Sequence, residues 1–369
     1  MQLSTLQDVY AHPGPYVTVH LDVSRNTEDA PQQLDARWTS ARHELERAGV
    51  DAALVEEIRN RLHEPVEVAG DARRTIIAAD GRVVFDEVLA GTSVWPETVT
   101  VGDLPDLAAW AHQADGQLPF LLVVADREGA DLDFYPTRAQ PAANATVEGD
   151  DLHLHKYQGG GWSHRRFQQR SENQWESNAR EVADEIRDLV KRHRPRIVLL
   201  AGDERARTSI AGALDGIQSE VVHVTAGGRA AGSSDEALWE EVDRVLAAYK
   251  AADQVETIGS LEQRWGQGSG AVLGVDDVLE ALVQHKVDTL IVDLQKAHDL
   301  TVDPSRFPGL PIPEQATTKK ELPADQVLVA AGAATDTHLA VLPAAQTKGG
   351  GVAALLRWDD RAEDGRDDR

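Results

Sequence analysis

Residues 156–180 read KYQGGGWSHRRFQQRSENQWESNAR and determine how the middle of the chain folds. Three glycines, Gly159–Gly161, precede Trp162, and small or apolar residues then recur at steps of three and four. These positions are Phe167, Ser171, Trp175, Ala179, Val182, Ile186 and Leu189. Because this spacing is the period of one helix face, and because Pro195 cannot continue a helix, the stretch predicts a glycine loop followed by a long helix that ends by His193.

The same stretch has the charge of a phosphate-binding segment. No acidic residue lies between Asp151 and Glu172, and the positive end of a helix dipole favours phosphate. Glycine backbone can approach RNA closely, and Trp162 offers a face for base stacking. An ordinary loop before a helix is the alternative. The predicted RNA-binding residues are Lys156, Gly159, Gly160, Gly161, Trp162, Ser163, His164, Arg165, Arg166 and Arg170.

Length and composition narrow the class of protein. The 369 residues are enough for two or three domains, and 41% hydrophobic residues can form proper cores. A net charge of −25 argues against a DNA-binding protein with broad basic surfaces, although charge concentrated on a few loops still allows RNA binding. The absence of cysteine excludes disulfides and Cys-ligated zinc. With no signal peptide or membrane span in the sequence, we expect a cytoplasmic protein.

Alternating helical and extended patterns predict an α/β first domain up to residue 116. Residues 16–22 alternate as a strand does, residues 34–48 and 53–62 have helical spacing, and a further helix is expected at 104–112. Asp80-Gly81 separates two more strands and is a strong hairpin signal.

The middle of the chain predicts a mostly parallel sheet covered by helices. Apolar runs at 119–125 and 196–201 have the pattern of buried strands, with 130–135 as a hairpin partner and 221–225 as a further strand. Asp203 and Glu204 follow a strand, where a carboxylate pair is either catalytic or, more commonly, the start of a helix. A capping box at 233–236 opens a helix that extends to Trp265. The glycines at 266–270 lack the Lys-Ser/Thr of a nucleotide P-loop.

The last part of the chain predicts another α/β domain, with helices at 275–285 and 324–334 and strands at 287–293 and 338–342. The proline-rich segment 303–323 is expected to be a mobile or inserted loop, and residues 359–369 a solvated acidic tail. The spacing of Asp299, Asp303 and Asp336 supports no metal site, and we expect no metal, cofactor or catalytic residue in the chain.

Three segments resemble the archaeo-eukaryotic class-1 release factors. In that family a Gly-Gly-Gln loop is followed by Ser, a basic residue, Phe and an Arg-rich helix, which residues 160–170, GGWSHRRFQQR, resemble with Trp162 in place of Gln. Residues 270–292 resemble the family's Gly-Val-acidic-Asp helix and the Val-x-x-Leu-Ile-Val strand after it. Residues 348–358, KGGGVAALLRW, resemble its closing Gly-rich strand. The first domain resembles only the bacterial branch of this superfamily.

The resemblance implies an α/β fold with the three-domain architecture of release factors and Pelota, each domain a mixed sheet packed with helices. The expected domains are an N-terminal α/β domain at 1–116, a middle domain with the Gly-rich loop at 117–266, a C-terminal release factor-like domain at 267–358, and the tail at 359–369.

The resemblance also implies a function. The indole of Trp162 is only a donor and too bulky to place water as the family's Gln does, and the stop-codon-reading motifs Asn-Ile-Lys-Ser and Tyr-x-Cys-x-x-x-Phe are missing. The chain is therefore similar to bacterial relatives of the Balon type, which are ribosome hibernation factors. The implied partners are the 70S ribosome, through rRNA of the A site and peptidyl transferase centre, and elongation factor Tu at the C-terminal domain. We expect a monomer that contacts neither DNA nor membrane.

Two other functions stay open. The chain is alternatively a peptidyl-tRNA hydrolase or ribosome rescue factor in which Gln158 replaces the missing Gln, or an RNA-binding protein that acts away from the ribosome.

Overall fold

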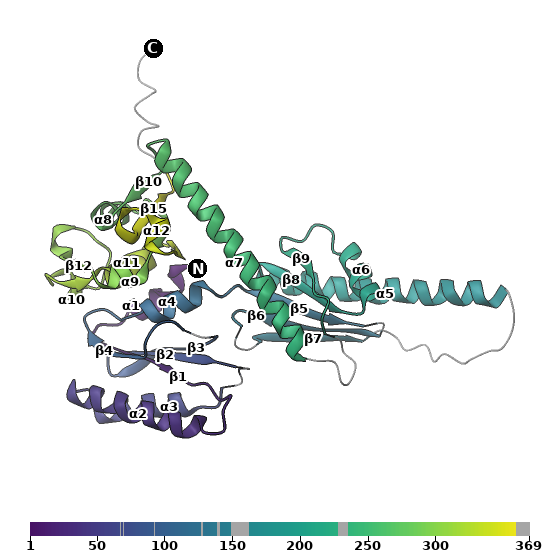
Figure 1. The fold of residues 1–369 in the computed structure, drawn as a ribbon, viewed down its shortest axis with the longest axis horizontal. Coiled ribbons are helices and arrows are strands. Elements are labelled where there is room, and N and C mark those ends of the chain that lie inside the picture. Colours follow the sequence, from purple (N-terminus) through teal and green to yellow (C-terminus); the bar gives the residue numbers. More distant parts are fainter. Residues whose placement is uncertain are drawn as a thin grey trace, which may run out of the picture. The chain divides into compact units, whose positions relative to one another are not determined.

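The computed structural model describes residues 1–66, 68, 70–91, 93–126, 128–138, 141–148, 162–227 and 235–358; the side chains of residues 148, 162–176 and 235 are not described. The chain folds as two compact units, Met1–Gly116 with Ala251–Arg369, and Gln117–Lys250 (Figure 1). The mixed α/β class predicted from the sequence is confirmed. Among the described residues, no helix is long and apolar enough to span a bilayer.

The first part of unit 1 is an antiparallel sheet with helices on both faces. Its strand order is β3-β2-β1-β4, and Asp80 and Gly81, both with positive φ, make the expected hairpin turn between β2 and β3. Strand β4 was not predicted. The elements are η1 (Leu3–Leu6), α1 (Gln7–Tyr10), β1 (Tyr16–Asp22), α2 (Ala30–Arg47), α3 (Ala52–His63), β2 (Ala72–Ala79), β3 (Arg82–Ala90), β4 (Thr98–Gly102) and α4 (Ala108–Asp115).

The second part of unit 1 has a sheet of order β10-β15-β11-β14, in which β11 and β14 are parallel and the other pairs antiparallel. A small ladder joins β12 to β13. The elements are β10 (Ala271–Leu273), α8 (Val275–Val283), β11 (Val287–Val292), α9 (Leu294–His298), β12 (Thr301–Val302), η2 (Pro304–Arg306), α10 (Glu314–Thr317), β13 (Leu322–Pro323), α11 (Ala324–Ala334), β14 (His338–Val341), α12 (Ala344–Thr347), η3 (Gly349–Gly351) and β15 (Val352–Leu356).

One apolar core joins the two parts of unit 1. Leu3 and Leu6 of η1 are fully buried and belong to the same core as Val327 and Leu328 of α11. The N-terminal ammonium group of Met1 is also tied into this core, because it donates to the backbone carbonyl of Leu339 in β14.

The expectation of a mobile or inserted loop at 303–323 was wrong. Phe307, Leu310 and Ala316 from this segment are buried in the core of unit 1, and Asp303 caps η2 by accepting from the backbone N–H of Ser305. Prolines interrupt regular structure but do not prevent burial of the apolar residues between them. The segment is therefore part of the packed fold.

Unit 2 is built on a mixed sheet of order β7-β6-β5-β8-β9. Strands β5, β8 and β9 are parallel, whereas β6 and β7 are antiparallel to their neighbours, so the expected mostly parallel sheet is only half of the sheet found. Strand β7 was not predicted. The elements are β5 (Phe120–Ala125), β6 (Gly129–Tyr135), β7 (Ala143–Glu148), α5 (Trp162–His193), β8 (Ile197–Gly202), α6 (Glu204–Ala213), β9 (Glu220–His223) and α7 (Asp235–Gly266), whose last residues belong to unit 1.

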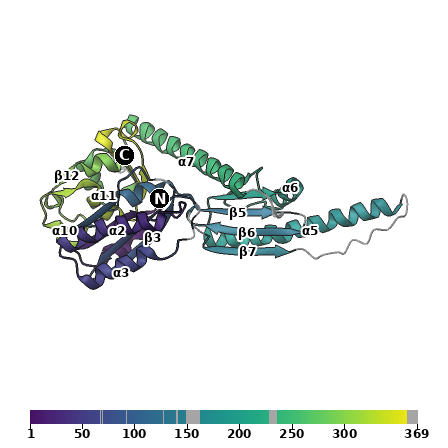
Figure 2. The ribbon, with the colours of Figure 1, turned by 60° about the horizontal axis from the view of Figure 1, so that its bottom comes forward.

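Alternate residues of β5 supply the two faces of this sheet. Leu121 and Val123 point into the core beneath α5 and α6, whereas Phe120 and Leu122 point into the core beneath α7. This alternation follows from the period of two of a β-strand. It places α5 on one face of the sheet and α7 on the other (Figure 2).

Candidate nucleic-acid interface

The described C-terminal half of helix α5 packs on the sheet. Of the seven positions that predict its apolar face, Ala179, Val182, Ile186 and Leu189 are buried against the sheet and α6. The other three fall among the residues of α5 whose side chains are not described. The helical period therefore identifies the packed face correctly wherever it can be checked.

The packed part of α5 begins level with the end of the sheet. Strand β5 ends at Ala125 and β6 begins at Gly129, and Asn178 and Ala179 of α5 line a cavity with Asp126 and Gly129 from that turn. The edge strand ends at the same level, since Glu148 pairs with Gly129.

Residues 162–177 therefore extend past the sheet. At a rise of about 1.5 Å per residue these residues add about 24 Å of helix beyond the strand ends. Figures 1 and 2 both show the N-terminal end of α5 standing clear of the strands. The structure thus places the start of α5 at the end of an arm.

The residues predicted to bind RNA lie at or before the tip of this arm. Trp162, Ser163, His164, Arg165, Arg166 and Arg170 belong to the first turns of α5, where the backbone is helical and the side chains are not described. Lys156 and Gly159–Gly161 lie outside the described residues, as does Gln158. The helix runs from Trp162 to His193, in agreement with the expected long helix that ends by His193.

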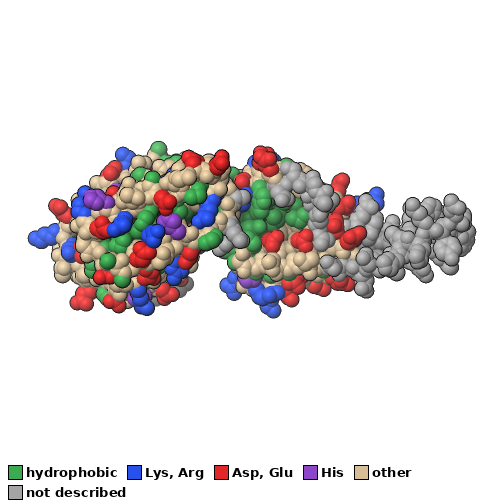
Figure 3. Space-filling view, turned by 90° about the horizontal axis from the view of Figure 1, so that it is seen from below, with side chains coloured by type: hydrophobic (Ala, Val, Ile, Leu, Met, Phe, Trp, Pro, Cys, Tyr) green, Lys and Arg blue, Asp and Glu red, His purple; other side chains and the backbone are tan. Residues whose placement is uncertain are grey.

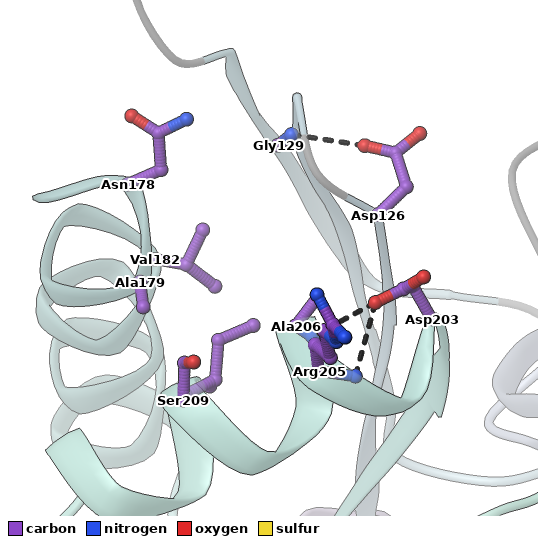
Figure 4. Close-up of a pocket in the computed structure, with 10 residues that line it drawn as sticks. Asp126, Gly129, Asn178, Ala179, Val182, Asp203, Arg205, Ala206 and Ser209 are labelled. Atoms are coloured by element: carbon purple, nitrogen blue, oxygen red, sulfur yellow. Dashed lines mark hydrogen bonds between the residues drawn. The ribbon is translucent and has the colours of Figure 1, made fainter. Parts of the chain in front are cut away.

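The carboxylates beneath the arm cap the backbone. Asp203 is the N-cap of α6, where its Oδ1 accepts from the backbone N–H groups of Arg205 and Ala206 at 3.0 and 3.1 Å (Figure 4). Asp126 accepts from the N–H of Gly129 at 3.0 Å and closes the β5–β6 turn. The more common reading of the Asp203-Glu204 pair, a helix start, is confirmed.

The cavity between these caps and α5 is too small for a substrate. Its volume is about 20 Å³, which holds about one water molecule. The arm, and no pocket beneath it, is therefore the candidate functional feature of unit 2.

A glycine holds the two central strands together at the base of the arm. Gly202 has φ +99°, and a Cβ atom there would lie 1.9 Å from the carbonyl oxygen of Ala125. The carbonyl oxygen of Gly202 accepts from Nε of the buried Arg207 at 3.2 Å. Only glycine fits this close approach, and sequence reasoning missed it because an isolated Gly after a strand has many explanations.

The opposite face of the sheet carries an aromatic and ionic cluster that the sequence did not predict. The guanidinium of Arg138 lies 3.7 Å from the ring centroid of Trp239, and its Nε donates to Oδ1 of Asp243 at 2.7 Å. Tyr135 meets Trp239 edge to face, with ring centroids 5.3 Å apart. Burial raises the pKa of Tyr135 to about 12. This cluster fixes α7 on the sheet.

Charge on the described surface is mixed. On the face in Figure 3, Lys and Arg side chains are scattered among Asp and Glu, with no broad basic area among the residues drawn in colour. A protein of net charge −25 therefore needs a local basic element to meet RNA. By sequence, the first turns of α5 from Trp162 to Arg170 contain three arginines and no acidic residue.

A mixed α/β protein with a basic-tipped helical arm is the class that these features define. Residues 119–267 match the model of bacterial archaeo-eukaryotic release factor family 2, a range that includes β5, the arm and α7. The predicted resemblance to this family is thereby confirmed for residues 119–267.

Relatives match over almost the whole chain. "Uncharacterized protein Rv2629" of Mycobacterium tuberculosis is 27% identical over 374 residues, covering 97% of each chain. Among solved structures, Saccharomyces cerevisiae Dom34 is 9% identical with a TM-score of 0.40, covering 96% of this chain and 92% of that one. The archaeal Pelota of a model of ribosome-bound Pelota and ABCE1 is 14% identical with a TM-score of 0.39, covering 97% and 94%.

Proposed function

We propose that the protein is a ribosome-binding translation factor that occupies the A site in the manner of Balon-type hibernation factors, without releasing peptide. The observation that carries the proposal is the arm of α5, which projects about 24 Å beyond its sheet and lies within the segment that matches a release factor family. An arm of this kind delivers a loop into a narrow RNA-lined space that the body of the domain cannot enter.

Local charge supports contact with RNA. The first turns of α5 carry Arg165, Arg166 and Arg170 before the first acid, Glu172. The unpaired N–H groups of a helix start add to their attraction for phosphate. Such binding releases counterions and weakens as salt rises.

The residue after the glycines argues against release chemistry. Trp162 stands where the family's Gln is expected, and an indole N–H cannot accept a proton from water. Stacking of this ring on a base is the role that its chemistry allows. In this proposal elongation factor Tu accompanies the protein through the C-terminal part of the chain.

The test is co-sedimentation with 70S ribosomes across a salt series. We expect Arg165→Ala/Arg166→Ala to weaken binding by about 1–3 kcal/mol if both side chains contact phosphate, and to flatten the salt dependence. The matched control is Lys191→Ala/Arg192→Ala, which removes two exposed charges from the packed end of the same helix. An equal loss in both variants would contradict a specific role of the tip.

A peptide-release assay distinguishes a factor that only occupies the A site from an enzyme that hydrolyses peptidyl-tRNA. We expect the wild-type protein to leave peptidyl-tRNA intact on stalled ribosomes. Release that disappears in Gln158→Ala would overturn the proposal in favour of the hydrolase or rescue factor. Absence of the protein from the ribosome pellet at every salt concentration would favour an RNA-binding protein that acts elsewhere.

A further inference from the structure

Three side chains of metal-ligand type meet in unit 1, away from the arm. Asp106 lies just before α4, His298 is the last residue of α9, and Asp325 is in the first turn of α11. One ligand atom from each lies within 4.8 Å of the other two. The fold brings together residues that lie more than two hundred positions apart in the sequence.

The group carries more buried negative charge than it can neutralise. The side chain of Asp325 is 1% exposed and Asp106 is 7% exposed. His298 Nδ1 lies 3.3 Å from Asp325 Oδ2, and a single imidazolium balances only one of the two carboxylates. An unbalanced buried carboxylate is costly.

One oxygen of the group lacks a partner. Asp325 Oδ1 is buried and, among the residues that the structure describes, accepts no hydrogen bond. Buried polar atoms are nearly always satisfied, and an exception calls for a missing ligand or ion. Asp106 is held in place independently, since its backbone N–H donates to Oγ1 of Thr18 at 3.1 Å.

We propose that Asp106, His298 and Asp325 bind one divalent first-row transition-metal ion. A doubly charged ion beside a neutral imidazole offsets the negative charge of two carboxylates, and it supplies the missing partner of Asp325. Two carboxylate oxygens and one imidazole nitrogen suit Zn²⁺ or Mn²⁺.

The geometry requires a small closure around the ion. Ligand atoms of a bound zinc lie about 3–4 Å apart, given metal–ligand distances of about 2 Å. His298 can make most of that movement, because its side chain is 40% exposed and stands at the end of a short helix. The exposed edge also gives the ion a route from solvent. The bound ion would link α9 and α11 to the segment before α4.

The experiment uses full-length, untagged protein stripped with chelator, to which Zn²⁺ or Mn²⁺ alone is added. We expect one ion per chain by elemental analysis, and a melting temperature that rises by several degrees. His298→Gln and Asp106→Asn remove one ligand each and should lower the affinity at least about tenfold. The matched control is His63→Gln, which breaks another histidine–carboxylate pair, His63 Nε2 to Asp35 Oδ1 at 3.0 Å, and should bind the ion as wild type does.

Two outcomes would overturn the proposal. Wild-type protein that binds neither ion stoichiometrically would show that the group is an ion pair alone. Undiminished binding by His298→Gln would place the ion elsewhere. If Asp106→Asn fails to fold, His298→Gln still decides, because its partly exposed side chain is the one least needed for packing. The arm and its RNA contacts play no part in this test, so its result is independent of the proposed function.

Discussion

Shortening the arm tests whether its reach matters. Deleting residues 171–177 removes about 10.5 Å of α5 and leaves the remaining positions within about 20° of their original face. The deletion takes away Glu172 and Glu176 but no cation, so charge alone would tighten RNA binding. We expect weaker ribosome binding instead. Loss of base stacking at the tip costs about 1–3 kcal/mol, a factor of about 5–150 in Kd.

Stability should hardly change, because the buried residues described on α5 begin at Ala179, and we expect an effect below about 0.5 kcal/mol. The control replaces residues 171–177 with an alanine-rich helical sequence of equal length that keeps both glutamates. Pelleting with 70S ribosomes should separate the two variants. Unchanged affinity of the deletion, or an equal loss in the replacement, would refute the argument from length. A large loss of stability would show that this part of the helix packs on the body.

Three further outcomes are expected. Trp162→Ala should lose ribosome affinity at unchanged melting temperature, whereas a large loss of stability would place the indole in the core. A second variant, Trp162→Gln, tests whether a restored Gly-Gly-Gln triplet releases peptide. Gly202→Ala should destabilise unit 2 by about 1–3 kcal/mol, because the Cβ of the alanine would meet the carbonyl oxygen of Ala125 at 1.9 Å. Urea unfolding measures this change, and an unchanged free energy of unfolding would contradict the close approach. His20 is buried against Thr75 Oγ1, and burial lowers its pKa to about 4. As pH falls, His20 is therefore protonated in the unfolded chain before it is protonated in the folded one. The stability that the neutral, buried His20 allows is full above about pH 6.5 and is lost as pH falls towards 4. The free energy of unfolding of His20→Leu should depend less on pH over this range.

The packed elements could be predicted because their signals are local. Apolar spacing in α5 is set by residues three and four apart, and the Asp80-Gly81 turn by two adjacent residues with positive φ. Strands β4 and β7 were missed because they lie at sheet edges, where burial is incomplete and apolar alternation is weak. Their pairing comes from neighbouring strands and not from their own composition.

The rest depends on contacts between distant residues. Apolar residues of the segment 303–323 enter a core formed by both ends of the chain. The local sequence of the segment does not indicate this burial. The group of Asp106, His298 and Asp325 is likewise invisible to a search for ligand spacing, because its members come from three separate elements. The arm could be predicted only in part. Periodicity predicts a long helix, but the length by which the helix extends past the sheet depends on where β5 ends.

Under the proposed function, the arm would also reconcile an acidic chain with an RNA partner. At physiological salt, the Debye length is about 8 Å, so a tip about 24 Å beyond the sheet stands roughly three screening lengths from the sheet of unit 2. In the proposed complex, repulsion between the sheet of unit 2 and RNA would be largely screened, while Arg165 and Arg166 would meet phosphate at contact distance. Deleting residues 171–177 brings the tip to about 13.5 Å, under two screening lengths. The shortened protein should therefore lose affinity most at low salt, where screening is weakest, and this reversal of the ordinary salt trend separates repulsion by the body from simple loss of reach.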